Sequence, residues 1–185
     1  MSVIAVQKTP NKITFAWDTQ TKRYGQPYYD PHKVSKFGYG IIGFVGQTKI
    51  RPYLHEYLKK RASVDSFSLS TEYSVCSLFD DFRNNFLFDD FISFDDQDNV
   101  LISDSKKVYN IDPSTNECFE INEFEAVGSG GDLAWGAFKA GADIVQACEI
   151  ACDLNLECGK PVKFLEVELL VVIRLCLYYN PLQKG

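Results

Sequence analysis

The residue whose type and position point most directly to chemistry is Ser2. It follows Met1, and a methionine before a residue as small as serine is normally removed, which would leave Ser2 with a free α-amine beside its hydroxyl. A serine placed in this way can act as a nucleophile with its own amine as the base. Most chains that begin Met-Ser make no such use of the serine, so the rest of the chain must support this hypothesis.

The cysteines and histidines offer a different chemistry. His32 and His55 are the only histidines, and Cys148 and Cys152 are spaced to share one face of a helix. No Cys-x-x-Cys pair is present, so we expect no metal site and no cofactor. We interpret the six cysteines as reduced, buried thiols, including Cys158, which precedes a glycine. The histidines have no cysteine or aspartate partner in the sequence and are not candidate bases.

The composition indicates one globular domain over residues 1–185, with the tail from residue 168 left unassigned. A hydrophobic content of 45% and an aromatic content of 14% exclude a disordered chain. The net charge of −6 argues against a nucleic-acid partner, which would need a basic surface. No basic and then apolar signal region opens the chain, and the apolar stretch 169–179 is too short to span a bilayer. We therefore expect a cytoplasmic protein without a membrane partner. We expect residues 169–179 to form a core strand or a terminal helix.

Hydrophobic periodicity predicts mostly strands in the N-terminal half. Residues 3–6 and 13–18 alternate as a β-hairpin does, and a glycine and two prolines mark residues 19–32 as a loop. The segment 62–90 is predicted as a helix that buries phenylalanines, followed by the edge of a strand. The other expected elements of this half are strands at 33–37 and 41–45 and a helix at 51–61.

The C-terminal half is predicted to change from strands to helices. Short apolar runs between residues 91 and 111 indicate a β-meander, and a further strand at 124–127 stops at Gly-Ser-Gly-Gly. Helical spacing then covers residues 132–141 and 143–154, and a late strand covers 162–167. This order of elements suggests sheets covered by helices, in four layers.

Five short motifs then match a known family in order and spacing. They are the opening Ser-Val-Ile-Ala-Val, Phe-Ala-Trp-Asp-Thr-Gln at 15–20, His-Lys-Val-Ser-Lys-Phe at 32–37, Ile-Gly-Phe-Val-Gly at 42–46 and Val-Gly-Ser-Gly-Gly at 127–131. Together they resemble the proteasome β-subunits and HslV-type peptidases, which are N-terminal nucleophile hydrolases. The resemblance implies an α+β fold, a four-layer αββα sandwich of two antiparallel sheets flanked by helices.

The resemblance also implies a catalytic set around Ser2. Asp18 matches the family's catalytic aspartate, and Lys33 matches its catalytic lysine. The backbone amide of Gly43 would serve the oxyanion hole, and Ser129 would lie beside the amine of the nucleophile. Taken singly, a lysine in an alternating strand is usually solvated and an aspartate after a strand is usually a turn residue, so these assignments depend on the resemblance.

The chain departs from the family at two supporting positions. The family's Asp-x-x-Ser-Gly-Gly motif falls on residues 155–160, where Asn155 replaces the aspartate and Cys158 replaces the serine. Serine also stands at the nucleophile position, where threonine is commoner. The family's substrate-binding positions fall on Ile41, Val45 and Gly46, and the apolar side chains among them suggest cleavage after apolar residues.

The resemblance implies a self-compartmentalised peptidase that hydrolyses peptide bonds. Its partners would be protein or peptide substrates, further copies of itself in a homo-oligomeric ring, and an AAA+ unfoldase. Two alternatives stay open. The first is a catalytically inactive, proteasome-like structural subunit, which the departures at residues 155 and 158 favour. The second is an amidase that uses the same class of nucleophile on a small molecule.

Overall fold

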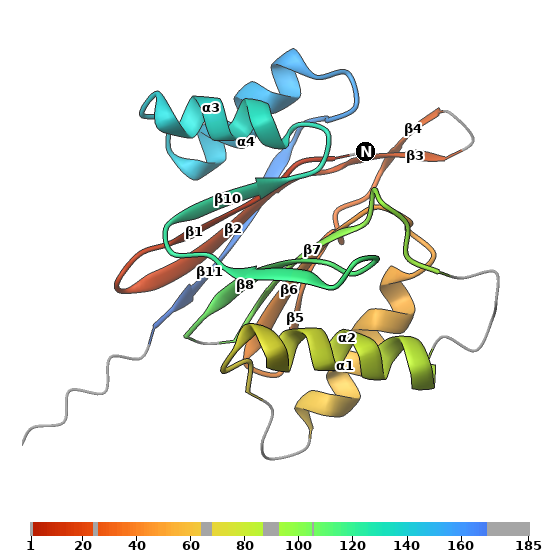
Figure 1. Cartoon of the computed structure of the whole chain (residues 1–185). Coiled ribbons are helices and arrows are strands. Elements are labelled where there is room, and N and C mark those ends of the chain that lie inside the picture. The colour runs from red at the N-terminus through yellow and green to blue at the C-terminus, as the bar shows by residue number, and fades with distance from the viewer. Residues whose placement is uncertain (1, 24–25, 64–67, 87–92, 105, 170–185) are drawn as a thin grey trace, which may run out of the picture.

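Two antiparallel sheets face each other, and a pair of helices covers the outer face of each (Figure 1). The computed structural model describes residues 2–23, 26–63, 68–86, 93–104 and 106–169. Its layers form the αββα sandwich that the sequence predicted. Over this part of the chain, no helix is both long enough and apolar enough to cross a lipid bilayer.

The first sheet has the strand order β10-β1-β2-β11. Its β1–β2 hairpin confirms the prediction, and Ile4 pairs with Trp17 in it. One face of β1 and β2 packs on helices and the other on the second sheet, which is why both strands are apolar along most of their length. The strands are β1 (Ile4–Lys8), β2 (Lys12–Asp18), β10 (Phe124–Val127) and β11 (Val162–Glu168).

The second sheet has the strand order β5-β6-β7-β8-β9. Strand β9 was not predicted from the sequence; it follows a tight turn where Asn116 has a φ of 63°. Residues 91–94 are the first apolar run of the predicted β-meander; no strand is formed at 93–94, and residues 91–92 lie outside the described residues. The strands are β5 (Val34–Phe37), β6 (Gly40–Val45), β7 (Asn99–Ser103), β8 (Val108–Asp112) and β9 (Glu117–Glu120).

Two helices cover the second sheet, and two others cover the first (Figure 1). The helix predicted within 62–90 is α2, and its side chains Phe79 and Phe82 are fully buried in the core. Helix α4 begins after Asp143, whose carboxylate accepts from the Gln146 amide, while the Asp143 amide donates to the Gln146 Oε1. The helices are α1 (Arg51–Ala62), α2 (Glu72–Phe86), α3 (Gly131–Lys139) and α4 (Ile144–Leu154).

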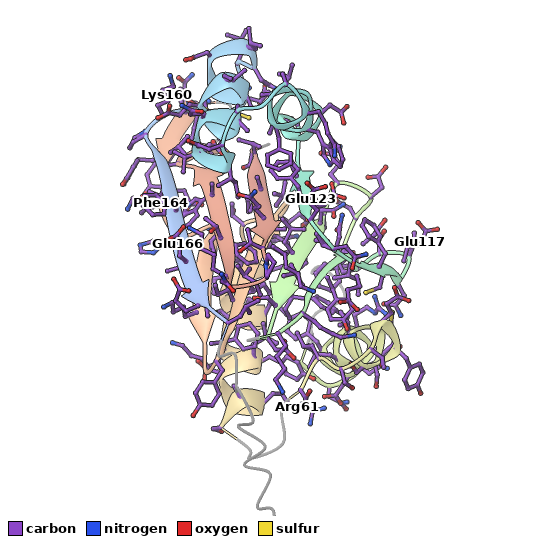
Figure 2. The ribbon with its side chains drawn as sticks, turned by 90° about the vertical axis from the view of Figure 1, so that its left-hand side faces the viewer. Arg61, Glu117, Glu123, Lys160, Phe164 and Glu166 are labelled. Atoms are coloured by element: carbon purple, nitrogen blue, oxygen red, sulfur yellow. The ribbon has the colours of Figure 1, made fainter. Side chains whose placement is uncertain are left out.

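Residues 19–32, predicted as a loop, instead contain a hairpin of β3 (Gln20–Arg23) and β4 (Gln26–Tyr29). Every residue of β4 is exposed, so the alternation that marks a half-buried strand is absent from its sequence. Pro27 is tolerated because β4 is an edge strand. At the other end of the chain, β11 forms the edge of the first sheet and carries Phe164 and Glu166 (Figure 2). The element predicted at 169–179 lies, beyond Leu169, outside the described residues.

Candidate active site

Strand ends bring Ser2, Asp18 and Lys33 to one place. Ser2 lies just before β1, Asp18 ends β2, and Lys33 lies just before β5. The hairpin register sets the start of β1 against the end of β2, where the Asp18 amide donates to the Val3 carbonyl at 3.1 Å. All three candidate residues are buried, with at most 5% of each exposed. They are therefore not the solvated strand and turn residues that the types alone would suggest.

Asp18 and Lys33 form a buried ion pair. The Lys33 Nζ donates to the Asp18 Oδ1 at 2.6 Å. The Val3 amide donates to the same oxygen at 2.9 Å, which places the lysine beside the start of β1. The amides of Gln20 and Gly159 each donate to Oδ2 at 3.1 Å. These donors replace the hydrogen bonds to water that the Asp18 carboxylate loses on burial.

Burial also changes the acid–base behaviour of Lys33. Its Nζ donates to the Gln20 carbonyl as well as to Asp18. Loss of water lowers the pKa of Lys33 from its ordinary value, and the attraction of Asp18 offsets this only in part. A buried lysine with a lowered pKa and one specific carboxylate partner is a candidate for a functional site.

The Gly-Ser-Gly-Gly turn packs against the carbonyl group of Ser2 and donates to it. The Gly130 amide donates to the Ser2 carbonyl oxygen at 3.2 Å, and the Ser129 hydroxyl lies 3.5 Å from the same oxygen. Gly128 has a φ of +91°, and a Cβ at this position would overlap that carbonyl. A Cβ on Gly130 would lie 2.7 Å from the Cys158 sulfur. The close approach of backbone and sulfur explains why glycines flank Ser129.

The two departures from the family motif lie behind this turn. The Asn155 Nδ2 donates to the Ser129 carbonyl at 2.6 Å, and its Oδ1 accepts from the Glu157 amide at 2.8 Å. Asn155 thus holds the backbone of the turn. The Cys158 sulfur lies 4.0 Å from the Ser129 hydroxyl, and burial raises the pKa of this thiol to about 11. The thiol is therefore protonated at neutral pH, which fits a packing residue better than a nucleophile.

Gly43 lies inside the second sheet, where it pairs with Val34 on one side and Leu101 on the other. The neighbouring Phe44 amide donates to the Lys33 carbonyl at 3.0 Å, on the β5 side. Successive residues of a strand point their amides to opposite sides, so the Gly43 amide points toward β7. A Cβ on Gly43 would lie 3.0 Å from the Ile4 side chain, so this glycine lets the two sheets approach.

The expected substrate-binding positions are divided between the core and the end of β6. Ile41 and Val45 are 1% and 4% exposed and pack between the sheets, so neither lines an open cavity. Gly46 follows the last residue of β6 and has a φ of +126°. Its amide therefore lies past the end of the strand ladder.

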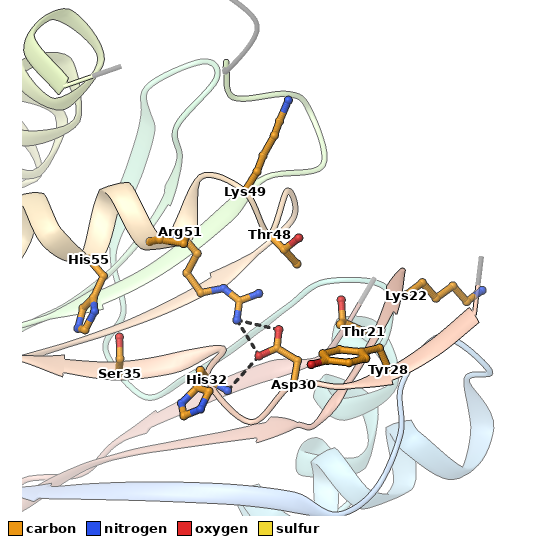
Figure 3. A pocket seen from close by; sticks show the side chains of 11 residues that line it. Thr21, Lys22, Tyr28, Asp30, His32, Ser35, Thr48, Lys49, Arg51 and His55 are labelled. Atoms are coloured by element: carbon orange, nitrogen blue, oxygen red, sulfur yellow. Dashed lines mark hydrogen bonds and ion pairs between the residues drawn. The ribbon is translucent and has the colours of Figure 1, made fainter. Parts of the chain in front are cut away.

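A cavity of about 580 Å³ opens beside this site (Figure 3). It adjoins the site because His32 precedes Lys33, and Thr21 follows the Gln20 whose carbonyl accepts from Lys33. No sequence pattern predicted this cavity, because its walls come from separate parts of the chain: the β3–β4 hairpin, the residues before and within β5, the segment after β6, and α1. The lining residues are Thr21, Lys22, Tyr28, Asp30, His32, Ser35, Thr48, Lys49, Arg51, Pro52 and His55.

The chain matches no protein-family model and no curated protein, but solved structures share its fold. Thiobacillus denitrificans BPH, alone and in complex with epoxomicin, is similar with TM-scores of 0.72 and 0.71 and identities of 20% and 22%, over 90% of this chain and 98% of that one. HslV from Trypanosoma brucei has a TM-score of 0.67 at 16% identity, over 90% and 99% of the two chains. The Anbu complex from Pseudomonas aeruginosa, a helical assembly, has a TM-score of 0.68 at 13% identity, over 90% and 81%.

These similarities each cover 90% of this chain. The chain therefore has the proteasome-like N-terminal nucleophile hydrolase fold.

Proposed function

We propose that this chain is a peptidase whose nucleophile is the hydroxyl of Ser2, exposed as the first residue when Met1 is removed. The observation that carries the proposal is the buried Asp18–Lys33 pair, which shares Asp18 Oδ1 with the amide that follows Ser2. Burying two charges is unfavourable unless their geometry is good, so such a pair beside a candidate nucleophile favours a chemical role.

Each residue then has a part in acyl transfer. The α-amine of Ser2, with an ordinary pKa of about 7.7–8.0, takes the hydroxyl proton as the oxygen attacks the peptide carbonyl. The same amine then gives that proton to the departing amine, and water hydrolyses the ester left on Ser2. Lys33 favours the developing alkoxide electrostatically, and Asp18 orients Lys33. Ser129, beside Ser2, helps to hold the amine.

The oxyanion needs a backbone amide that is free to donate. The sequence motif assigned this role to Gly43, whose amide points toward β7 within the ladder. We therefore favour the amide of Gly46, past the end of β6. One such donor contributes roughly 3–4 kcal/mol to the stability of the transition state.

The rival proposal is an inactive subunit that keeps only the fold. Two observations favour it. The Ser129 hydroxyl lies 3.5 Å from the Ser2 carbonyl oxygen, which is long for a hydrogen bond, and Asn155 stands in place of a carboxylate. Against it, Asn155 still holds the Ser129 turn, and both members of the Asp18–Lys33 pair are present. The amidase alternative would use the same nucleophile on a smaller substrate.

Intact mass spectrometry separates these proposals. The protein should lack Met1 and should gain the mass of one inhibitor after incubation with epoxomicin, a peptide epoxyketone that T. denitrificans BPH binds. The epoxyketone reacts with a hydroxyl and an adjacent free amine, so Ser2→Ala, which keeps the amine, should remain unmodified. Retention of Met1 on most molecules would rule out the enzymatic proposal.

The remaining parts of the proposal concern partners. We propose protein or peptide substrates, a homo-oligomeric ring of this chain that encloses the active sites, and a cytoplasmic location in which an AAA+ unfoldase feeds substrates into that ring. Support for self-association comes from the similarity to Anbu, which has been solved as a helical assembly.

A further inference from the structure

The cavity beside Lys33 contains an ion pair that leaves one strong donor unused. The Arg51 guanidinium holds both carboxylate oxygens of Asp30, at 2.8 Å and 3.0 Å (Figure 3). Asp30 also accepts from the His32 amide at 3.1 Å. The Arg51 Nε is buried and has no acceptor among the described residues. Asp30 is thus well supplied with donors, whereas Arg51 retains a buried N–H without a partner.

A buried donor without an acceptor is uncommon in folded proteins and calls for an explanation. Guanidinium N–H groups only donate, so the group that completes Arg51 must be an acceptor. The hydroxyls of Thr21, Ser35 and Thr48 also line the cavity, and each can donate to an acceptor within it. Of the charged lining residues, Lys22, Lys49 and Arg51 are basic, and Asp30 alone is acidic. Both hydrogen bonding and charge therefore favour an anionic occupant.

We propose that this cavity binds the side-chain carboxylate of an aspartate or glutamate in the peptide substrate, next to the bond that Ser2 attacks. The proposal rests on the proposed peptidase function, because the cavity adjoins Lys33. Arg51 supplies the Nε–H to the incoming carboxylate while its Nη1 stays on both oxygens of Asp30. This acidic preference replaces the apolar one expected from Ile41 and Val45, which are buried between the sheets.

Binding, measured apart from turnover, tests the pocket itself. The full-length Ser2→Ala protein is titrated by calorimetry with three acetylated, amidated peptides that differ only in carrying Glu, Gln or Leu at one position. The Glu peptide should bind about tenfold more tightly than the Gln peptide, as one charge-assisted hydrogen bond allows. Equal binding of the three, tighter binding of Leu, or no binding of any would overturn the proposal.

Arg51→Lys keeps the positive charge beside Asp30 but removes the Nε–H. It should reduce the preference for Glu over Gln to less than about threefold, since only the directed donor is lost. Arg61→Lys is the matched control, because Arg61 lies on the same helix but pairs with Asp81 outside the cavity. An unchanged preference in Arg51→Lys would contradict the proposal. If Arg51→Lys does not fold, Thr48→Val serves instead, because it removes a cavity hydroxyl and no charge. It should weaken binding of the Glu peptide severalfold. Unchanged binding of that peptide would contradict the proposal.

Turnover of the same peptides by the unmodified protein separates the two proposals. Selective, Arg51-dependent binding of the Glu peptide without any hydrolysis would support the proposed binding site and contradict the proposed peptidase function. Hydrolysis of all three peptides at equal kcat/KM would support the peptidase function and contradict the proposed acidic binding site.

Discussion

Asp18 and Lys33 are charged groups that folding removes almost completely from water, with 0% and 2% of their side chains exposed. Taken singly, the two residue types suggest solvated side chains whose loss would have little effect on stability, whereas the family resemblance implies a catalytic role for both. In the structure, each is the main compensation for the other's burial. A mutation of either residue therefore changes stability as well as chemistry, and activity data alone would be ambiguous.

Lys33→Met should abolish peptide hydrolysis and should also lower the free energy of unfolding by about 3–5 kcal/mol, because it leaves the Asp18 carboxylate buried without its cation. The double variant Lys33→Met/Asp18→Asn removes both charges and should recover part of that loss. Urea unfolding of the two variants and of Ser2→Ala measures this. Ser2→Ala should be inactive at nearly unchanged stability, since it deletes one hydroxyl. A change below about 1 kcal/mol in Lys33→Met would show that the pair is not buried in solution.

Cys158→Ser should be tolerated. The sulfur is buried beside Gly130 and lies 4.0 Å from the Ser129 hydroxyl, so a serine hydroxyl has a nearby polar partner. We expect kcat/KM within about threefold of the parent and a stability change below about 1 kcal/mol, typical of a small change with a satisfied hydroxyl. A peptide assay and thermal unfolding measure the two. Complete loss of activity in a folded protein would mean that the thiol takes part in the reaction.

At the scale of elements, a network that includes the side chain of Tyr57 joins the two helices over the second sheet. The Tyr57 hydroxyl of α1 donates to Asp81 of α2 at 2.5 Å, and the Arg61 Nε donates to that hydroxyl at 3.2 Å. Burial, followed by the hydrogen bond to Asp81, raises the pKa of Tyr57 to about 12. Because the unfolded tyrosine titrates at its ordinary value near 10, the folded chain holds more protons than the unfolded chain between these values.

Stability should therefore fall as the pH rises from about 10 to about 12, with a contribution from Tyr57 of about 1–2 kcal/mol. The contribution is fully present below pH 10 and is lost as the pH passes through the folded-state pKa. Tyr57→Phe removes this hydroxyl, so the free energy of unfolding should decline less steeply in that variant. Urea unfolding at pH 9 and pH 11 of both proteins gives the difference. Parallel declines would show that Tyr57 is not protected from titration.

The elements that the sequence predicted best are those with one clear period or cap. The β1–β2 hairpin and α4, with its Asp143 capping box, belong to this class. The β3–β4 hairpin and β9 were missed because they bury little, so no alternation marks them. The motifs located Ser2, Asp18 and Lys33, but the Asp30–Arg51 contact depends on how β4 and α1 meet in space, which no local pattern reports.

At the scale of the molecule, the surface of the single chain exposes apolar side chains around the end of α4. Ile150 and Leu154 lie one helical turn apart and are 38% and 67% exposed, and Leu156 just beyond the helix is 94% exposed. Single exposed leucines are ordinary, but neighbouring ones point to a surface that another protein covers. A second copy of this chain is the partner that the proposed ring would supply.

Light scattering on the full-length protein should thus give a particle several times the 21.0 kDa chain mass. Leu154→Lys places a charge where the contact would exclude water, so it should shift the protein toward the single-chain mass with its helical circular dichroism unchanged. Tyr73→Lys is the matched control, because Tyr73 is 81% exposed on α2, which covers the other sheet. A single-chain mass for the unmodified protein across a concentration series would contradict the ring. Equal dissociation in both variants would instead show that added charge, and not the α4 surface, controls assembly.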